Sequence, residues 1–98
     1  MNQLDKFKTF IKDRNENVKV GLVGAGQMGQ GIVAQVSKMY GVELVCIIDR
    51  NQKQLDNAAN RYKKHKENEL LCSDSISALD SVDLDIVIEA TGTPAAGA

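Results

Sequence analysis

Cysteine and histidine are scarce in this chain. It has two cysteines, Cys46 and Cys72, and one histidine, His65, and no two cysteines stand at CxxC spacing. Residues this sparse and far apart make neither a zinc site nor a disulfide framework, so we expect no metal and no disulfide. Each cysteine follows apolar residues, which is typical of small buried thiols.

Long apolar runs and a strong net charge are also missing. No run of about 18 apolar residues exists to cross a membrane, and the formal net charge of −1 offers no broad attraction for nucleic acid. The first 14 residues are mixed in charge and lack an apolar core of signal-peptide length, so we expect a cytoplasmic protein. At 98 residues there is room for one small domain, but not for a cofactor domain plus a substrate domain.

The N-terminal segment, residues 1–17, has its own pattern. Leu4, Phe7, Phe10 and Ile11 recur at three- and four-residue steps, which predicts an amphipathic helix that packs by one stripe. Polar residues 15–17 then interrupt the pattern. We therefore expect a helix and linker in residues 1–17 and a separate domain in residues 18–98.

Strand-like and helix-like segments alternate from residue 18 onward. Apolar runs at 18–23 and 42–48 suit strands covered on both faces, and residues 86–90 predict a last strand. A helix after the first strand, with Met28, Ile32, Val36 and Met39 on one face, is expected to end near Gly41. A second helix carries the inward residues Leu55, Ala58, Ala59 and Tyr62. A weak strand at 70–72 and a brief helix follow, with Ser75 as cap and Ile76 and Leu79 facing inward.

This alternation predicts an α/β fold. Right-handed crossovers between parallel strands give a Rossmann-type doubly wound sheet with helices on both faces and strand order 3-2-1-4. The second mononucleotide-binding half is missing, which leaves the last strand as an open edge. We therefore expect a fragment of a larger protein, truncated to about the first half of the fold.

The glycines Gly24, Gly26 and Gly29 form a GxGxxG pattern, which alone is a weak signal. Here it follows a strand, opens a helix and precedes an acidic residue, Asp49, about 25 residues further on. Gly24 would permit the tight turn, Gly26 the approach of a pyrophosphate to the backbone, and Gly29 close packing of helix on strand. The alternative is a tight turn without a ligand.

The residues around these glycines complete the predicted cofactor site. The first N–H groups of the helix, near Gln27 and Met28, would point at the phosphates with the positive end of the helix dipole behind them. Asp49 would accept hydrogen bonds from the adenosine ribose, or it merely caps the next helix. Its carboxylate favours NAD over NADP, although Arg50 could stack on adenine or meet a 2'-phosphate.

The carboxyl end of the last strand runs into Thr91, Gly92, Thr93 and Pro94. Ligands of open α/β sheets bind where such ends meet and the winding reverses. We expect Thr91, Gly92 and Thr93 to line the later part of the cofactor, unless the segment is only a solvent turn. Glu89, within the strand, is expected to be a packing or edge residue.

Other nucleotide-binding classes fit less well. S-adenosylmethionine-dependent methyltransferases often have an acidic residue just before the glycines, where this chain has Leu22 and Val23. NTPase loops need a Lys followed by Ser or Thr, and Gln30 and Gly31 supply neither. A non-enzymatic NAD(P)-binding or sensor module stays open, although no output segment is visible.

The stretches VKVGLVGAGQMGQG and DIVIEATGTP resemble the N-terminal NAD(P)-binding region of homoserine-dehydrogenase-like oxidoreductases, in particular those that carry a SAF domain. The resemblance implies a parent dehydrogenase that transfers hydride between nicotinamide and a small hydroxy or carbonyl metabolite. It places the catalytic residues and the substrate pocket beyond this chain, so we assign no catalytic residue and expect the chain alone to be inactive. Many relatives form dimers, which makes a homo-oligomer an expectation.

Overall fold

The computed structural model describes residues 17–91. The predicted N-terminal helix, Gly92 and Thr93 lie outside these residues. Within the described range the elements follow in the order β1 (Val18–Val23), α2 (Gln27–Ser37), β2 (Val42–Ile48), α3 (Gln52–Lys63), β3 (Leu71–Ser73), the 3-10 helix η1 (Ile76–Ser81) and β4 (Ile86–Glu89).

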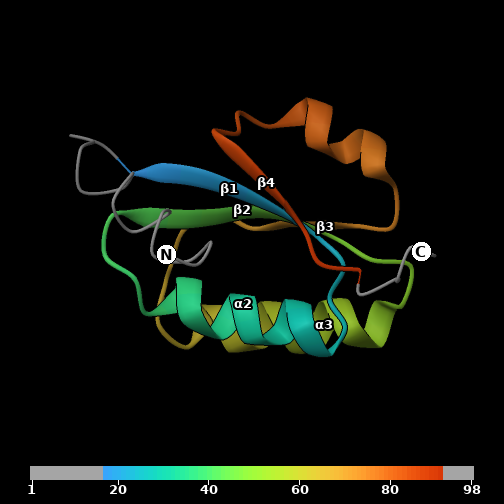
Figure 1. Ribbon diagram of the computed structural model, residues 1–98, viewed down its shortest axis with the longest axis horizontal. Helices are drawn as coiled ribbons and strands as arrows, with labels where there is room; N and C mark the ends of the chain where they lie inside the picture. Colours follow the sequence, from blue (N-terminus) through green and yellow to red (C-terminus); the bar gives the residue numbers. More distant parts are fainter. Residues whose placement is uncertain (1–16, 92–98) are drawn as a thin grey trace, which may run out of the picture.

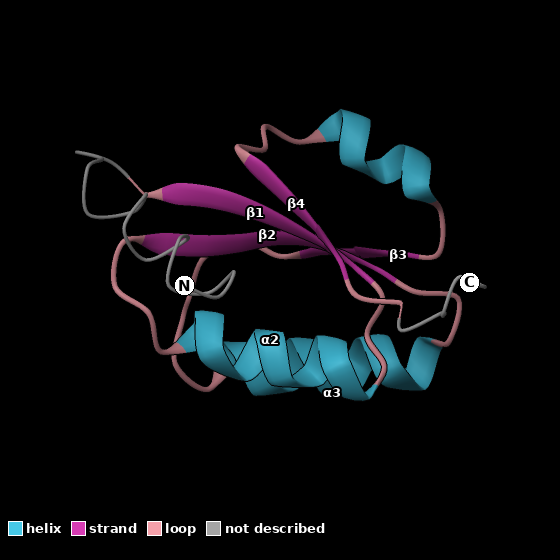
Figure 2. Cartoon of the chain, viewed as in Figure 1, coloured by secondary structure: helices cyan, strands magenta, loops and turns pink. Residues whose placement is uncertain are grey.

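The four strands form one parallel sheet in the order β3-β2-β1-β4, which confirms the predicted topology. Helices α2 and α3 lie side by side on one face of the sheet, below it in Figure 1. The short helix η1 lies on the opposite face, as Figure 2 shows. The chain moves from β1 to β3 in one direction and returns to place β4 on the other side of β1, so the winding reverses between β1 and β4.

The core lies between the sheet and the pair α2 and α3. Alternate residues of β1, namely Val18, Val20 and Leu22, are fully buried against these helices. On α2 the buried face consists of Gly29, Val33, Val36 and Ser37. Met28, expected on the inward face, is 58% exposed, so that prediction is wrong.

The rotation of α2 is set by Gly29, which has no side chain and therefore no weight in a hydrophobic pattern. A Cβ at Gly29 would lie 2.0 Å from the carbonyl oxygen of Gly24, so the helix backbone rests directly on the preceding turn. This contact turns the stripe of residues 29, 33 and 36 inward and leaves Met28 at the surface.

Helix α2 also ends earlier than expected, at Ser37. The Ser37 hydroxyl donates to the Ala34 carbonyl at 2.8 Å, and the amide of Lys38 donates to the Gln35 carbonyl at 3.1 Å. Gly41, with φ of 87°, makes the turn into β2 instead of ending the helix.

Side chains replace a neighbouring strand along the first half of β2, because β3 pairs only with the second half. The Tyr62 hydroxyl accepts from the Leu44 amide at 2.9 Å and donates to the Asn68 side chain, which itself donates to the Leu44 carbonyl at 3.0 Å. The Lys66 ammonium donates to the Val42 carbonyl. Burial raises the pKa of Tyr62 and lowers that of Lys66.

On the other face, η1 covers the sheet thinly. Leu79 and Leu84 pack over Gly21, where a Cβ would lie 2.9 Å from a Leu84 methyl carbon. Ser75 caps η1 as predicted, and its hydroxyl accepts from the Ser77 amide. Ile76, expected inward, is 64% exposed, so that prediction is wrong. None of the six residues of this 3-10 helix is buried.

Both cysteines are free thiols. Cys46 is buried, as expected, and Cys72 is half-buried. Burial raises the pKa of each thiol, which favours the protonated form at neutral pH.

Candidate functional site

The glycine turn connects β1 to α2 at the carboxyl end of the sheet, on the right of Figure 1. Gly24 has φ of 101°, a conformation that residues with a side chain rarely adopt. Its amide donates to the Ile48 carbonyl at 2.7 Å, and a Cβ would lie 2.7 Å from the Ala90 carbonyl oxygen. Gly24 is therefore required by the junction of β1 with β2 and β4.

Gly26 differs from the other two glycines. Its φ of −75° suits any residue, and a Cβ there would have nothing nearer than the Gln54 side-chain oxygen at 4.0 Å. Nothing in the fold therefore requires a glycine at this position. The missing Cβ leaves the backbone open to the approach of a ligand.

The first turn of α2 adds donors to this open space. Gly26 is the N-cap, no side chain caps the helix, and no acidic residue stands in its first turn. Gln27 and Met28 are exposed. The first N–H groups of a helix lack partners within it, so this end can hold an anion.

A hollow of about 510 Å³ lies beside this turn, lined by Gly26, Gln27, Met28, Ala90 and Thr91. The structure thus brings together the glycine turn and the end of β4, two segments far apart in the sequence. Thr91 lies beside the glycine turn, while Gly92 and Thr93 are outside the described residues.

Asp49 follows β2 and ties the glycine turn to the next loop. One carboxylate oxygen accepts from the Ala25 amide at 2.6 Å and the other from the Asn51 amide at 2.7 Å. A carboxylate offers about four acceptor positions, so two remain. Asp49 does not cap α3; Asn51 does, through a bond from the Gln54 amide at 3.1 Å. Arg50 is exposed in the same loop and lines neither hollow at the glycine turn.

Glu89 also acts at the site, a role that sequence reasoning missed. Its side chain is exposed, and one carboxylate oxygen accepts from the Thr91 hydroxyl at 2.7 Å and the Thr91 amide at 3.1 Å. These two bonds hold the pKa of Glu89 below its usual range. The carboxylate thereby orders the residue that lines the hollow. An exposed acid near a strand end gives no sequence signal for this.

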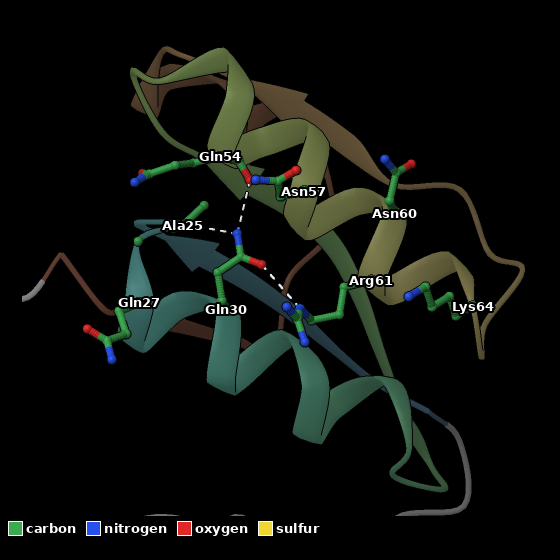
Figure 3. Close-up of a pocket in the computed structure, with 9 residues that line it drawn as sticks. Ala25, Gln27, Gln30, Gln54, Asn57, Asn60, Arg61 and Lys64 are labelled. Carbon is green, nitrogen blue, oxygen red and sulfur yellow. Dashed lines mark hydrogen bonds between the residues drawn. The ribbon is translucent and has the colours of Figure 1, made fainter.

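A second hollow, of about 420 Å³, lies between α2 and α3 and shares Gly26 and Gln27 with the first. Figure 3 shows its polar lining, in which Gln30 from α2 reaches both the glycine turn and Arg61 on α3. Sequence reasoning missed Gln30 as well, because a glutamine on a helix has no distinctive pattern.

Within residues 17–91, no helix has the length and apolar character needed to cross a membrane. Over the same part of the chain, no three histidine, cysteine or carboxylate side chains gather as a metal site would require.

A family model for shikimate / quinate 5-dehydrogenases matches residues 7–96. Among curated proteins, the chain is similar to an alpha-N-acetylgalactosaminidase of Shewanella oneidensis, with 34% identity over 87 residues. That alignment covers 84% of this chain and only 19% of the Shewanella protein, so the similarity concerns one part of a much longer molecule. The sheet order, the glycine turn and the family match agree, and the chain belongs to the shikimate / quinate 5-dehydrogenase family as an NAD(P)-binding domain of the Rossmann type.

Proposed function

We propose that the glycine turn of this chain holds the pyrophosphate of the cofactor. The observation that carries the proposal is the contrast among the three glycines. Packing accounts for Gly24 and Gly29, whereas a Cβ at Gly26 would meet only the Gln54 side-chain oxygen, at 4.0 Å. A glycine that the fold does not need, next to an uncapped helix N-terminus, is what a close approach of phosphate to backbone requires.

The remaining contacts follow from this position. Backbone N–H groups at Gly26, Gln27 and Met28 would bind the pyrophosphate, and the free acceptor positions of Asp49 would take the adenosine ribose hydroxyls. Thr91 lies on the other side of the turn, so it, with Gly92 and Thr93, would line the later ribose. When bound, the dinucleotide supplies the hydride acceptor or donor, and the residues described here orient it.

NAD is the cofactor we favour, although the family typically binds NADP. The Asp49 carboxylate would lie near the ribose and repel a 2'-phosphate. Arg50 beside it is exposed and lines neither of the two hollows at the glycine turn. An Asp49→Asn variant should raise the ratio of NADPH to NADH affinity about tenfold, about 1.4 kcal/mol. Loosening of the Ala25 tie affects both cofactors and cancels in the ratio. An unchanged ratio would show that Asp49 does not set the preference.

For the whole protein we propose only a class of reaction. We infer hydride transfer to or from a small hydroxy or carbonyl metabolite, of which homoserine is one member. The matched family is described as acting on shikimate or quinate, and the Shewanella protein as an alpha-N-acetylgalactosaminidase. A domain shared by proteins with such different names suits a cofactor-binding role, in which another part of each protein binds the substrate.

Calorimetric titration of the chain with NADH, NADPH and S-adenosylmethionine tests the proposal. We expect binding of NADH, weaker binding of NADPH, and none of S-adenosylmethionine. Binding of the last compound alone would favour the methyltransferase reading, and binding of none would leave an empty scaffold. The purified chain should not oxidise homoserine or shikimate.

A further inference from the structure

Gln30 makes more side-chain hydrogen bonds than its place on a helix surface requires. Its amide nitrogen donates to the Ala25 carbonyl at 3.0 Å and to the Gln54 carbonyl at 3.1 Å. Its amide oxygen accepts from the Arg61 side chain at 3.3 Å. Figure 3 shows these three bonds, which join the glycine turn to both helices.

These partners determine the orientation of the amide. Turning it over would bring the amide oxygen against two carbonyl oxygens, which cannot donate, and the nitrogen against a guanidinium, which cannot accept. Gln30 therefore acts as a donor toward Ala25.

The bond to Ala25 has a consequence for Gly26, since the two residues share one peptide plane. In a trans peptide the C=O and the following N–H point in opposite directions. With the Ala25 carbonyl held toward Gln30, the Gly26 N–H is directed away from the helix pair. The preceding plane is held separately, because the Ala25 amide donates to Asp49.

Packing does not fix the peptide plane shared by Ala25 and Gly26. The nearest atom to a Cβ at Gly26 would be the Gln54 side-chain oxygen at 4.0 Å, and glycine has access to more backbone conformations than other residues. The Gln30 side chain supplies the restraint on this plane through its bond to the Ala25 carbonyl. The next plane, between Gly26 and Gln27, is held separately, because the Gln30 backbone amide donates to the Gly26 carbonyl at 2.8 Å.

We propose that Gln30 is a positioning residue that aims the Gly26 N–H at the cofactor pyrophosphate. The proposal rests on the proposed function, because it assigns to Gln30 the orientation of a donor in that same site. The Gln54 and Arg61 bonds hold the amide in place for this task.

The test compares Gln30→Met, which keeps the length of the side chain but cannot donate, with Gln30→Lys, whose ammonium can donate to both carbonyls. Gln35 on the same helix is exposed and provides matched controls, Gln35→Met and Gln35→Lys.

The dissociation constant for NADH is measured well below the thermal midpoint of each variant. We expect Gln30→Met to weaken binding about tenfold, the effect of one lost hydrogen bond to an oriented group. Gln35→Met should bind as wild type.

The added positive charge can itself change the affinity for NADH, and Gln35→Lys measures that effect. After this effect is subtracted, Gln30→Lys should restore most of the affinity lost in Gln30→Met. A role confined to joining the two helices would lower the thermal midpoint of Gln30→Met without changing its affinity for NADH. That result would overturn the proposal, as would equal weakening in Gln30→Met and the corrected Gln30→Lys.

A second readout needs no ligand and separates this proposal from the proposed function. In NMR spectra of the free protein, the Gly26 amide signal should shift or broaden in Gln30→Met and return toward its wild-type position in Gln30→Lys. If wild type binds neither NADH nor NADPH, the proposed function fails, and these spectra still show whether Gln30 orients Gly26. An unchanged Gly26 signal in Gln30→Met overturns the inference, whatever the wild type binds.

Discussion

Replacement of Gly26 by alanine should separate cofactor binding from folding. The nearest neighbour of the new Cβ would be the Gln54 side-chain oxygen at 4.0 Å, an ordinary contact, and φ of −75° is open to alanine. Loss of unfolded-state entropy should stabilise the variant by about 0.4–1 kcal/mol. The poorer N-cap preference of alanine offsets this by roughly 0.5–1 kcal/mol. The thermal midpoint should therefore stay within about 5 °C of wild type.

Binding should respond very differently. The Cβ at Gly26 would occupy the space through which a phosphate oxygen reaches the backbone N–H groups. Losing one hydrogen bond to a charged group costs about 1.5–3 kcal/mol. This corresponds to a roughly ten- to hundredfold higher dissociation constant for NADH, measured by calorimetry.

Gly31 on the same helix provides the control, since a Cβ there meets nothing within 4 Å. Gly31→Ala should stabilise α2 by about 0.5–1 kcal/mol and leave the affinity for NADH unchanged. If Gly26→Ala bound NADH as tightly as Gly31→Ala, the approach of the pyrophosphate to Gly26 would be refuted.

Three further predictions concern the frame around the site. Gly29→Ala places a Cβ 2.0 Å from a backbone oxygen and should lower the free energy of unfolding by about 2–3 kcal/mol, measured as a lower denaturation midpoint. An unchanged midpoint would contradict the tight packing of α2. Tyr62→Phe leaves the Leu44 amide without its buried acceptor and should cost about 1–3 kcal/mol in urea unfolding, whereas wild-type stability would mean that water replaces the hydroxyl. Because the Thr91 hydroxyl and amide lower the pKa of Glu89, the bonds they make are complete above the ordinary value of 4.5 and are lost as pH falls through the lower folded value. The Thr91 amide resonance should therefore titrate below pH 4.5 and stay flat in Glu89→Gln.

The strands were the easiest elements to predict. The bounds of β1 and β2 match the apolar runs at 18–23 and 42–48, because strands covered on both faces are continuous apolar segments bounded by polar residues. Helix α2 was harder, since the residue that sets its rotation, Gly29, has no side chain. Hydrophobicity alone predicts that Ile76 faces inward, whereas none of the six residues of the short 3-10 helix is buried.

The candidate site divides in the same way. The glycines, Asp49 and Thr91 could be found because spacing along the chain and parallel topology bring strand ends to one edge. Gln30 and Glu89 could not, because the bonds that Gln30 makes to Ala25 and Glu89 makes to Thr91 depend on where the chain folds these residues.

The sequence by itself determined the order of strands and helices, the parallel sheet and the class of cofactor. These depend on local runs, their period and the handedness of crossovers, which the chain carries along its length. Only the tertiary structure decided which glycine has room for a Cβ and which side chains form hydrogen bonds to the turn. Those properties depend on distances of a few ångströms between segments that meet only after folding: Gly24 beside Ala90, Gly29 on the turn, and Gln30 beneath Ala25.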